Sequence, residues 1–202
     1  MSEILAQAAQ TAVAVALRYA RSGTSLARVA LAGSSHCVEF QHYPAKDVVD
    51  VRNGCRFYYH VHTSSRRPAQ EHGHFHLFAH GVGEQGYAHL GALSLDDRGV
   101  PLRWFVTNGW VTGESLDAAA RAADALARFR VDVRGRMAPL ARWLTAMVCL
   151  YADDLRDLQR QRDAWLAQQA RTRDARLVWE DRNFDVVCEC PADWMQRLAR
   201  WA

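Results

Sequence analysis

Histidines recur at every second position in two separate runs between Cys55 and His76. The first run is His60 and His62, and the second is His72, His74 and His76. Successive side chains of a β-strand point to opposite faces of a sheet, so each run predicts a strand with its imidazoles on one face. The chain is therefore expected to be built around a β-hairpin.

Residues 64–70 lie between the two runs and include a proline, which is typical of a loop. If the hairpin closes symmetrically around this loop, His60 lies opposite His74 and His62 lies opposite His72. Directly opposed residues of an antiparallel pair are about 4.5–5.5 Å apart at Cβ. The imidazoles of both runs are then expected to converge on one patch.

The period of two continues beyond the hairpin, and turn-forming residues divide this region into segments of strand length. About four strands are expected, at residues 55–63, 71–79, 87–95 and 102–108. Short turns between them favour an antiparallel β-meander. Upstream, we expect a short strand at 38–40 and an extended segment or turn at 47–51.

Helical patterns flank this sheet on both sides. We expect N-terminal helices at 2–20 and 25–32. On the C-terminal side we expect helices at 115–129, 139–170 and 192–201, with a short strand at 185–190. Apolar residues become sparse beyond Leu155, so the far end of the 139–170 helix is expected to project or to pair with a second copy in a homodimer.

These patterns predict the α+β class: a central antiparallel β-meander flanked by an N-terminal helix and a long C-terminal helical region. No linker or repeat divides the chain, so residues 1–202 are expected to form a single domain. Its parts are the N-terminal helices in 1–33, the histidine-bearing sheet in 38–108 and the helical region in 115–202.

The chain has 202 residues and a formal net charge of +3, and its basic residues are scattered among acidic ones. The absence of a basic block argues against nucleic acid as a partner. No apolar run reaches the length of a transmembrane helix, so no membrane association is expected. Five cysteines at irregular spacing, without an export signal, predict reduced thiols in a cytoplasmic protein.

Imidazole is a common ligand of zinc, iron, copper and nickel, and it binds in the neutral form that dominates near pH 7. The candidate ligands of such a divalent transition metal are His60, His62, His72, His74 and His76. Four protein ligands would make a closed structural site, whereas three would leave a position for water or substrate. One or two of the five are expected to act instead as outer groups, acid–base groups or ligands of a second ion.

Other residues near the runs are candidates for catalysis. Glu71 is the nearest carboxylate in sequence; strict alternation directs it away from His72, but this rule loosens where a strand begins. Tyr58 shares the face of the first run and could orient a ligand or a substrate. With His74, these two residues are the catalytic candidates, and His89 could reach the patch from the third strand.

Three features further from the runs bear on substrate binding. Arg66 and Arg67, in the hairpin loop, could meet an anionic small-molecule substrate. The glycine-rich segment 81–86 is expected to be a hairpin turn or a flexible lid. Trp110 is expected to pack under the helices.

Two motifs of the hairpin resemble those of known families. Gly54 followed by His60 and His62 resembles the Gly-x5-His-x-His opening of the cupin metal motif, which implies that these two histidines bind a metal together with a later Glu and His. The run from His72 to Phe78 resembles the histidine triad signature. In that family the middle histidine, here His74, attacks the α-phosphate of a nucleotide.

A longer pattern joins HYP at 42–44, DVVD at 47–50, YYHVH at 58–62 and EHGHFH at 71–76. Taken together, it most resembles an uncharacterised bacterial family of unknown function. This resemblance implies that these residues form a site shared by the family, and it implies no activity.

Three functions remain open on the sequence. The first is a metal-dependent enzyme with its site on the histidine-bearing sheet. The second is a nucleotidyl hydrolase or transferase acting through His74. The third is a non-catalytic metal-binding or assembly module, in which the 139–170 helix pairs with another copy.

Overall fold

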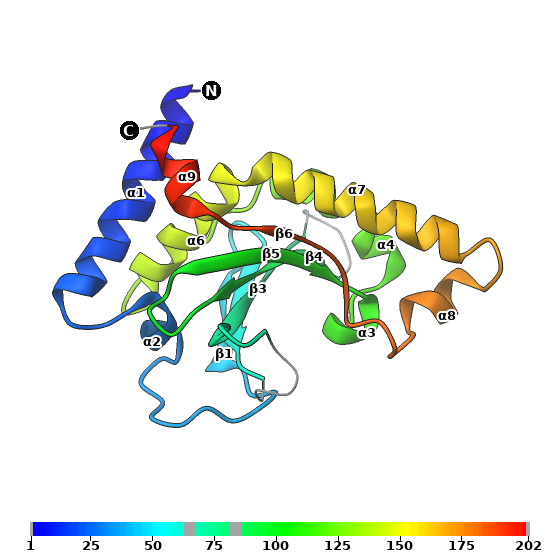
Figure 1. Ribbon diagram of the computed structural model, residues 1–202, viewed down its shortest axis with the longest axis horizontal. Coiled ribbons are helices and arrows are strands. Elements are labelled where there is room, and N and C mark those ends of the chain that lie inside the picture. Colours follow the sequence, from blue (N-terminus) through cyan, green and yellow to red (C-terminus); the bar gives the residue numbers. More distant parts are fainter. Residues whose placement is uncertain (1, 63–67, 81–85, 201–202) are drawn as a thin grey trace.

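The computed structural model describes residues 2–62, 68–80 and 86–200. Within these residues, six antiparallel strands form one sheet whose order follows the chain (Figure 1). The strands are β1 (Tyr43–Asp50), β2 (Cys55–His60), β3 (Gly73–Ala79), β4 (Ala88–Leu95), β5 (Pro101–Thr107) and β6 (Val186–Pro191). The expected antiparallel meander is confirmed, with one further strand at each edge.

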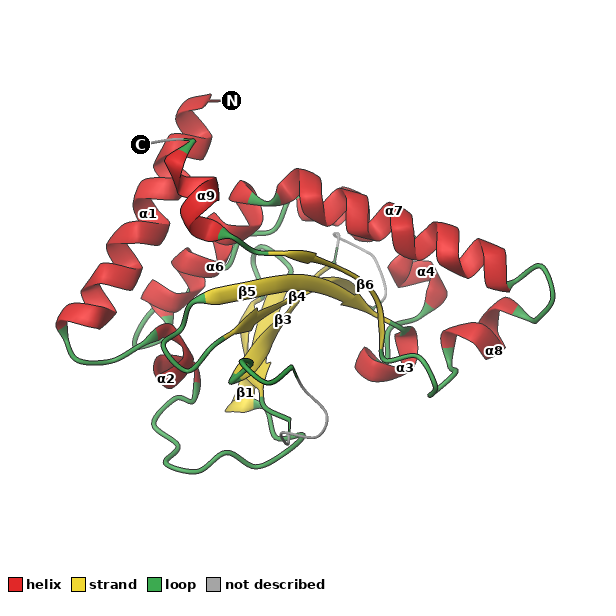
Figure 2. Ribbon diagram, in the orientation of Figure 1, coloured by secondary structure: helices red, strands yellow, loops and turns green. Residues whose placement is uncertain are grey.

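Most of the helices lie on one side of this sheet, which confirms the α+β class (Figure 2). Helix α1 packs against α6, and α7 crosses β4 and β5. None of the described helices has the length and apolar character needed to cross a membrane. The helices are α1 (Ser2–Arg21), α2 (Leu26–Ala30), α3 (Gly109–Thr112), α4 (Leu116–Ala119), α5 (Ala122–Leu126), α6 (Ala138–Leu150), α7 (Ala152–Gln169), α8 (Ala175–Trp179) and α9 (Trp194–Ala199).

Residues of β2 and β3 alternate between a helix-covered face and an opposite face that carries histidines. The register pairs Tyr59 with Phe75 and, one position along, His60 with His74. Tyr59 and Phe75 belong to the hydrophobic core, together with Trp143 of α6. Burial of the aromatic residues under the helices therefore fixes, by alternation, the face onto which the two histidines project.

The two edge strands differ in how well the sequence indicated them. β6 confirms the short strand expected at 185–190, and it pairs with β5. β1 covers most of residues 47–51, which were expected as an extended segment or turn. The strand expected at 38–40 is wrong: Phe40 lies in a turn with a φ of 63°, which an extended strand does not allow.

The prediction of a single helix over 139–170 is wrong in one respect. The helical region is interrupted at Tyr151, which separates α6 from α7. The backbone of Tyr151 has φ −111° and ψ 19°, outside the helical region. The helix expected over 115–129 is likewise divided, into α4 and α5. The short helices α4 and α5 both pack on β4, whereas α6 packs mainly on α1.

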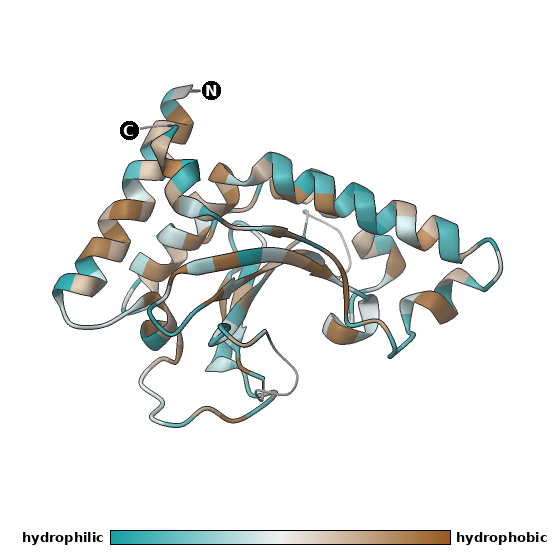
Figure 3. Ribbon diagram, viewed as in Figure 1, coloured by the Kyte–Doolittle hydropathy of each residue, from teal (hydrophilic) through white to brown (hydrophobic). Residues whose placement is uncertain are grey.

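Helix α7 lies on the sheet although most of its residues are hydrophilic (Figure 3). Leu155 and Leu158 are buried. The side-chain amide of Gln159 donates to the backbone carbonyls of His89, at 3.2 Å, and Leu90, at 3.0 Å. This part of α7 therefore packs on β4 rather than projecting. Pairing of two copies through residues 139–170 stays a prediction.

Substitution of Phe75 by alanine is expected to lower the free energy of unfolding by about 3–5 kcal/mol, because it empties a fully buried position. Urea denaturation followed by tryptophan fluorescence measures this change. The control is Val51→Ala at a side chain that is 85% exposed, where we expect a change below about 0.5 kcal/mol. Equal stabilities of the two variants would show that Phe75 does not anchor β3.

Candidate metal centre

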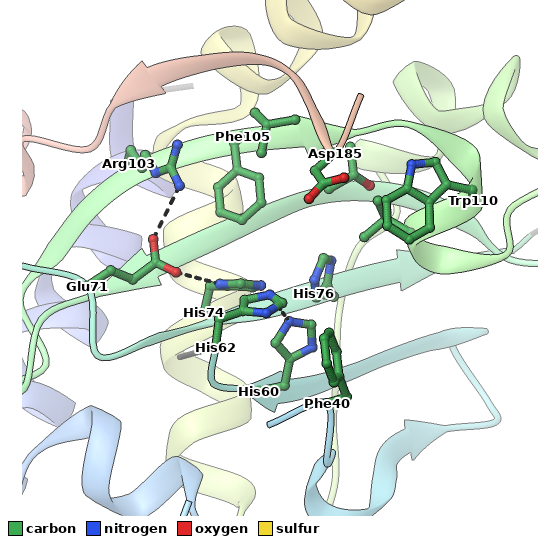
Figure 4. A pocket seen from close by; sticks show the side chains of 13 residues that line it. Phe40, His60, His62, Glu71, His74, His76, Arg103, Phe105, Trp110 and Asp185 are labelled. Atoms are coloured by element: carbon green, nitrogen blue, oxygen red, sulfur yellow. Dashed lines mark hydrogen bonds and ion pairs between the residues drawn. The ribbon is translucent and has the colours of Figure 1, made fainter. Parts of the chain in front are cut away.

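Three imidazoles from β2 and β3 meet on the open face of the sheet (Figure 4). One nitrogen from each of His60, His74 and His76 lies within 4.8 Å of the others. The ring centroids of His60 and His74 are 4.3 Å apart, and that of His76 is 4.9 Å from each of them. Imidazole nitrogens around a tetrahedral metal ion at about 2.0–2.1 Å lie roughly 3.4 Å apart, so small side-chain adjustments suffice.

A carboxylate orients His74. The Nδ1 atom of His74 lies 2.7 Å from Oε1 of Glu71. The other carboxylate oxygen of Glu71 accepts a hydrogen bond from Arg103 at 3.3 Å. Burial works to raise the pKa of Glu71, but the bond from His74 and the charge of Arg103 outweigh it, so the pKa is lowered. An ionised carboxylate only accepts, so His74 donates from Nδ1 and its lone pair is on Nε2.

A second imidazole orients His76. The Nδ1 atom of His76 lies 3.0 Å from Nε2 of His89, a buried residue of β4. The Nε2 atom of His76 is buried and has no hydrogen-bond partner among the described residues. An unpartnered buried nitrogen is costly, and a metal ion that accepts its lone pair would remove this cost.

Burial keeps two of the three clustered imidazoles, those of His60 and His76, neutral. It lowers the pKa of His60 to about 2, with further lowering from the neighbouring His74 and His62. Burial, together with the neighbouring His74 and His60, lowers the pKa of His76 well below its ordinary value. Burial and the charge of Arg162 lower the pKa of His89 to about 3. Neutral imidazoles are the form that binds a metal, so His60 and His76 need not lose a proton first.

The cluster forms one wall of a pocket of about 140 Å³. The two β4 residues that pair with these histidines are small: Ala92 pairs with His76, and Ser94 pairs with His74. The opposite wall comes from β5, the start of β6 and the segment after β5, and it includes Phe105. Small neighbours on β4 therefore leave space above the imidazoles for a ligand.

His62 lies at the edge of the same cluster. Its Nε2 atom is 2.9 Å from Nε2 of His60, and its ring contacts the ring of Phe40 at 5.6 Å between centroids. Its Nδ1 atom lies 3.9 Å from Glu39. The group of nitrogens within 4.8 Å does not include His62. His62 therefore contacts two of the three clustered histidines, because its ring centroid also lies 5.2 Å from that of His74, and it lines the pocket.

His72, which was expected to share the face of His74, does not join the cluster. Strand β3 begins only at Gly73, and the Nδ1 atom of His72 lies 2.8 Å from the hydroxyl of Tyr59 on the helix-covered face. Gly73 makes room for this hydroxyl, because a Cβ atom there would lie 2.7 Å from it. Glu71, and not His72, therefore lies beside His74.

Tyr58 shares the face of the cluster, as its position in β2 predicts. Its ring centroid is 5.1 Å from that of His76 and 3.6 Å from that of His42, which stacks on it. Burial and the charge of Asp47 raise the pKa of Tyr58. Tyr58 is not among the described residues that line the pocket, so its clearest role is to support His76 from below.

Several pocket residues were not singled out, or were placed elsewhere, on the sequence. Arg103 and Asp185 line the pocket, and they come from β5 and from the residue before β6. Trp110 was expected under the helices but also lines the pocket, and its Nε1 donates to the carbonyl of Phe184. Arg66, Arg67 and most of the segment 81–86 lie outside the described residues.

Residues 6–192 match the model of a protein family described as a domain of unknown function, DUF6969. The chain belongs to this family. The match spans the whole six-stranded sheet and the histidine cluster. No curated protein and no solved structure matches the chain. The expected membership of an uncharacterised family is confirmed, and the family assigns no activity.

A buried carboxylate lies behind the cluster. Glu114, between α3 and α4, accepts from the backbone N–H of His89 at 2.6 Å, and its Oε2 atom has no hydrogen-bond partner among the described residues. Burial raises the pKa of Glu114 to about 7, against the opposing charge of Arg162. Near neutral pH this side chain therefore exchanges its proton.

Glu114 is expected to make the protein less stable as the pH rises from about 4.5 to about 7. The folded state holds the proton up to the raised pKa, whereas the unfolded state releases it near the ordinary value. The stabilisation is full below about pH 4.5 and lost above pH 7. Across this window, the unfolding free energy of the wild type relative to Glu114→Gln should fall by about 3 kcal/mol. Parallel pH profiles in urea titrations would contradict the assignment.

Proposed function

We propose that this protein is a metal-dependent enzyme that binds one divalent transition-metal ion through His60, His74 and His76. The observation that carries the proposal is the buried Nε2 atom of His76, which has no described partner and lies in a cluster of three buried imidazoles at a pocket wall. Purely structural histidines of a sheet would be satisfied by backbone or side-chain groups.

The groups around the ligands support this proposal. In many metal sites the N–H of a histidine ligand's second ring nitrogen donates a hydrogen bond to a carboxylate or another polar group, which fixes the orientation of the ring. Glu71 stands in this relation to His74, and His89 stands in it to His76. Arg103 offsets the charge of Glu71. The residues needed to hold two ligands rigid are therefore present.

Three protein ligands favour a catalytic over a structural centre. A tetrahedral structural site uses four protein ligands, whereas three leave a position for water or substrate. An ion held by three imidazoles would polarise a bound group or lower the pKa of a bound water molecule. Zinc, iron, copper and nickel all suit imidazole ligands. Phe105, buried against His74 at 5.0 Å between ring centroids, would exclude bulk water from this position.

The cellular location belongs to the same proposal. All five cysteines are unpaired, although Cys188 and Cys190 lie two residues apart on β6. Free thiols persist in a reducing compartment. We therefore place the protein in the cytoplasm.

Nucleotidyl transfer through His74 is less well supported. Its Nε2 atom would be the nucleophile, because Nδ1 donates to Glu71. Such a reaction requires cationic or backbone groups around a phosphate. Arg103 is the one cationic side chain among the described residues lining the pocket, and it already contacts Glu71 and Glu189. Trapping of a phosphoramidate on His74 would reverse this preference.

Protein purified without a histidine tag and dialysed against zinc is expected to retain one zinc ion per chain, measured by elemental analysis. His60→Ala, His74→Ala and His76→Ala should each abolish stoichiometric binding, because each removes one of three ligands. The matched control is His72→Ala, which alters the same hairpin outside the cluster and should keep the ion. Equal retention by all four variants would rule out the site.

Glu71→Gln is expected to weaken zinc binding roughly 10- to 100-fold, because the orienting carboxylate of His74 loses its charge. Competition with a chromophoric chelator measures this change. Glu189→Gln, which removes the other carboxylate on Arg103, should change the affinity much less. An unchanged affinity in Glu71→Gln would show that Glu71 does not support a metal ligand.

A further inference from the structure

We propose that the pocket binds a small, single-ring organic monoanion, such as an aromatic carboxylate or phenolate, with its anionic oxygen on the metal ion. This inference rests on the proposed metal site. It follows from three properties of the pocket: the charge that its side chains leave uncompensated, its size, and the apolar character of its outer walls.

The charge of the ion determines the charge of the ligand. Three imidazoles are neutral and compensate none of the ion's two positive charges. Glu71 and Arg103 both line the pocket, and their opposite charges cancel. Glu189, the other carboxylate on Arg103, lies outside the lining with a side chain that is 53% exposed, so solvent screens its charge and it does not enter the balance. Asp185 is the other carboxylate among the described lining residues. It offsets one charge of the ion, so a monoanion completes the balance and a dianion exceeds it.

The volume of the pocket limits the ligand to about one ring. An apolar cavity of about 150 Å³ accommodates benzene in a well-studied protein, and this pocket has about 140 Å³. A nucleotide does not fit such a volume. A water-sized ligand would leave most of it unfilled.

Aromatic and aliphatic side chains form the outer walls. Phe105 lies edge-on to His74, and Phe40 lies edge-on to His62. The indole N–H of Trp110 donates to the carbonyl of Phe184, so its polar atom is already used. Val186 and Val111 complete the wall beside it. These surfaces favour a ring, which packs edge-to-face or offset against aromatic neighbours.

The position of Asp185 sets the polarity at the far end of the ligand. Figure 4 shows its carboxylate between Phe105 and Trp110, across the pocket from the imidazoles. The backbone there is fixed, because the N–H of Asn108 donates to the carbonyl of Asp185 at 3.0 Å. A carboxylate repels a second negative group and accepts from a hydroxyl or an amine. The far end of the ligand is therefore neutral or carries a hydrogen-bond donor.

The test uses the protein loaded with cobalt(II), whose visible spectrum responds to a new ligand. Benzoate is the single-ring monoanion, acetate is the monoanion without a ring, and phenyl phosphate is the dianion with the same ring. We expect benzoate to bind at least about 10-fold more tightly than either of the other two. Only benzoate combines a ring that packs against the apolar walls with the single negative charge that balances the ion.

Variants of lining residues that do not bind the ion test the pocket walls independently of the metal ligands. Trp110→Ala should weaken benzoate binding about 10-fold and leave acetate binding unchanged, because it removes apolar contact but no ligand of the ion. Asp185→Asn should bring the affinity for phenyl phosphate closer to that for benzoate. Met195→Ala, at an exposed side chain of α9, is the control and should alter neither.

The outcomes distinguish this inference from the proposed function. Failure of the wild type to bind cobalt overturns the metal site and, with it, the inference. Cobalt binding with equal affinities for benzoate and acetate overturns the inference alone, as does tighter binding of phenyl phosphate. Preference for benzoate that is lost in Trp110→Ala supports the ring-binding wall.

Discussion

The site depends on the antiparallel pairing of His60 with His74 across β2 and β3. This register brings two imidazoles together directly, and alternation adds His76 two positions along. The register is fixed from the other side of the sheet, where Tyr59 and Phe75 pair and pack under the helices. A shift by one residue would exchange the two faces, so the hydrophobic core and the histidine cluster stabilise the same register.

Much of this arrangement could be predicted from residue spacing, because the alternation of His60, His74 and His76 has a local cause. The prediction failed for His72, where the strand has not yet begun and the hydroxyl of Tyr59 attracts the ring. The same looseness brings Glu71 onto His74. Alternation thus gave the correct face for the histidines within β2 and β3, and it failed for the residues just before β3.

The rest of the pocket could not be predicted, because it comes from distant segments. Arg103 is on β5, and Asp185 precedes β6, which follows the long helical region. Their approach depends on the order of the whole sheet, and no local pattern marks them. His89 was within reach of the patch by strand order, yet its contact with His76 depends on an irregularity in the pairing of β3 with β4. Tertiary structure, and not periodicity, completes the site.

The central claim is an open metal centre with three imidazole ligands. If His62 also bound the ion as a fourth ligand, the centre would be closed. X-ray absorption spectroscopy of the zinc-loaded protein tests it most directly. The account predicts three imidazole nitrogens at about 2.0–2.1 Å, together with at least one oxygen from water or a small anion. A shell of four imidazole nitrogens without oxygen would contradict it, because the ion would then be closed to substrate.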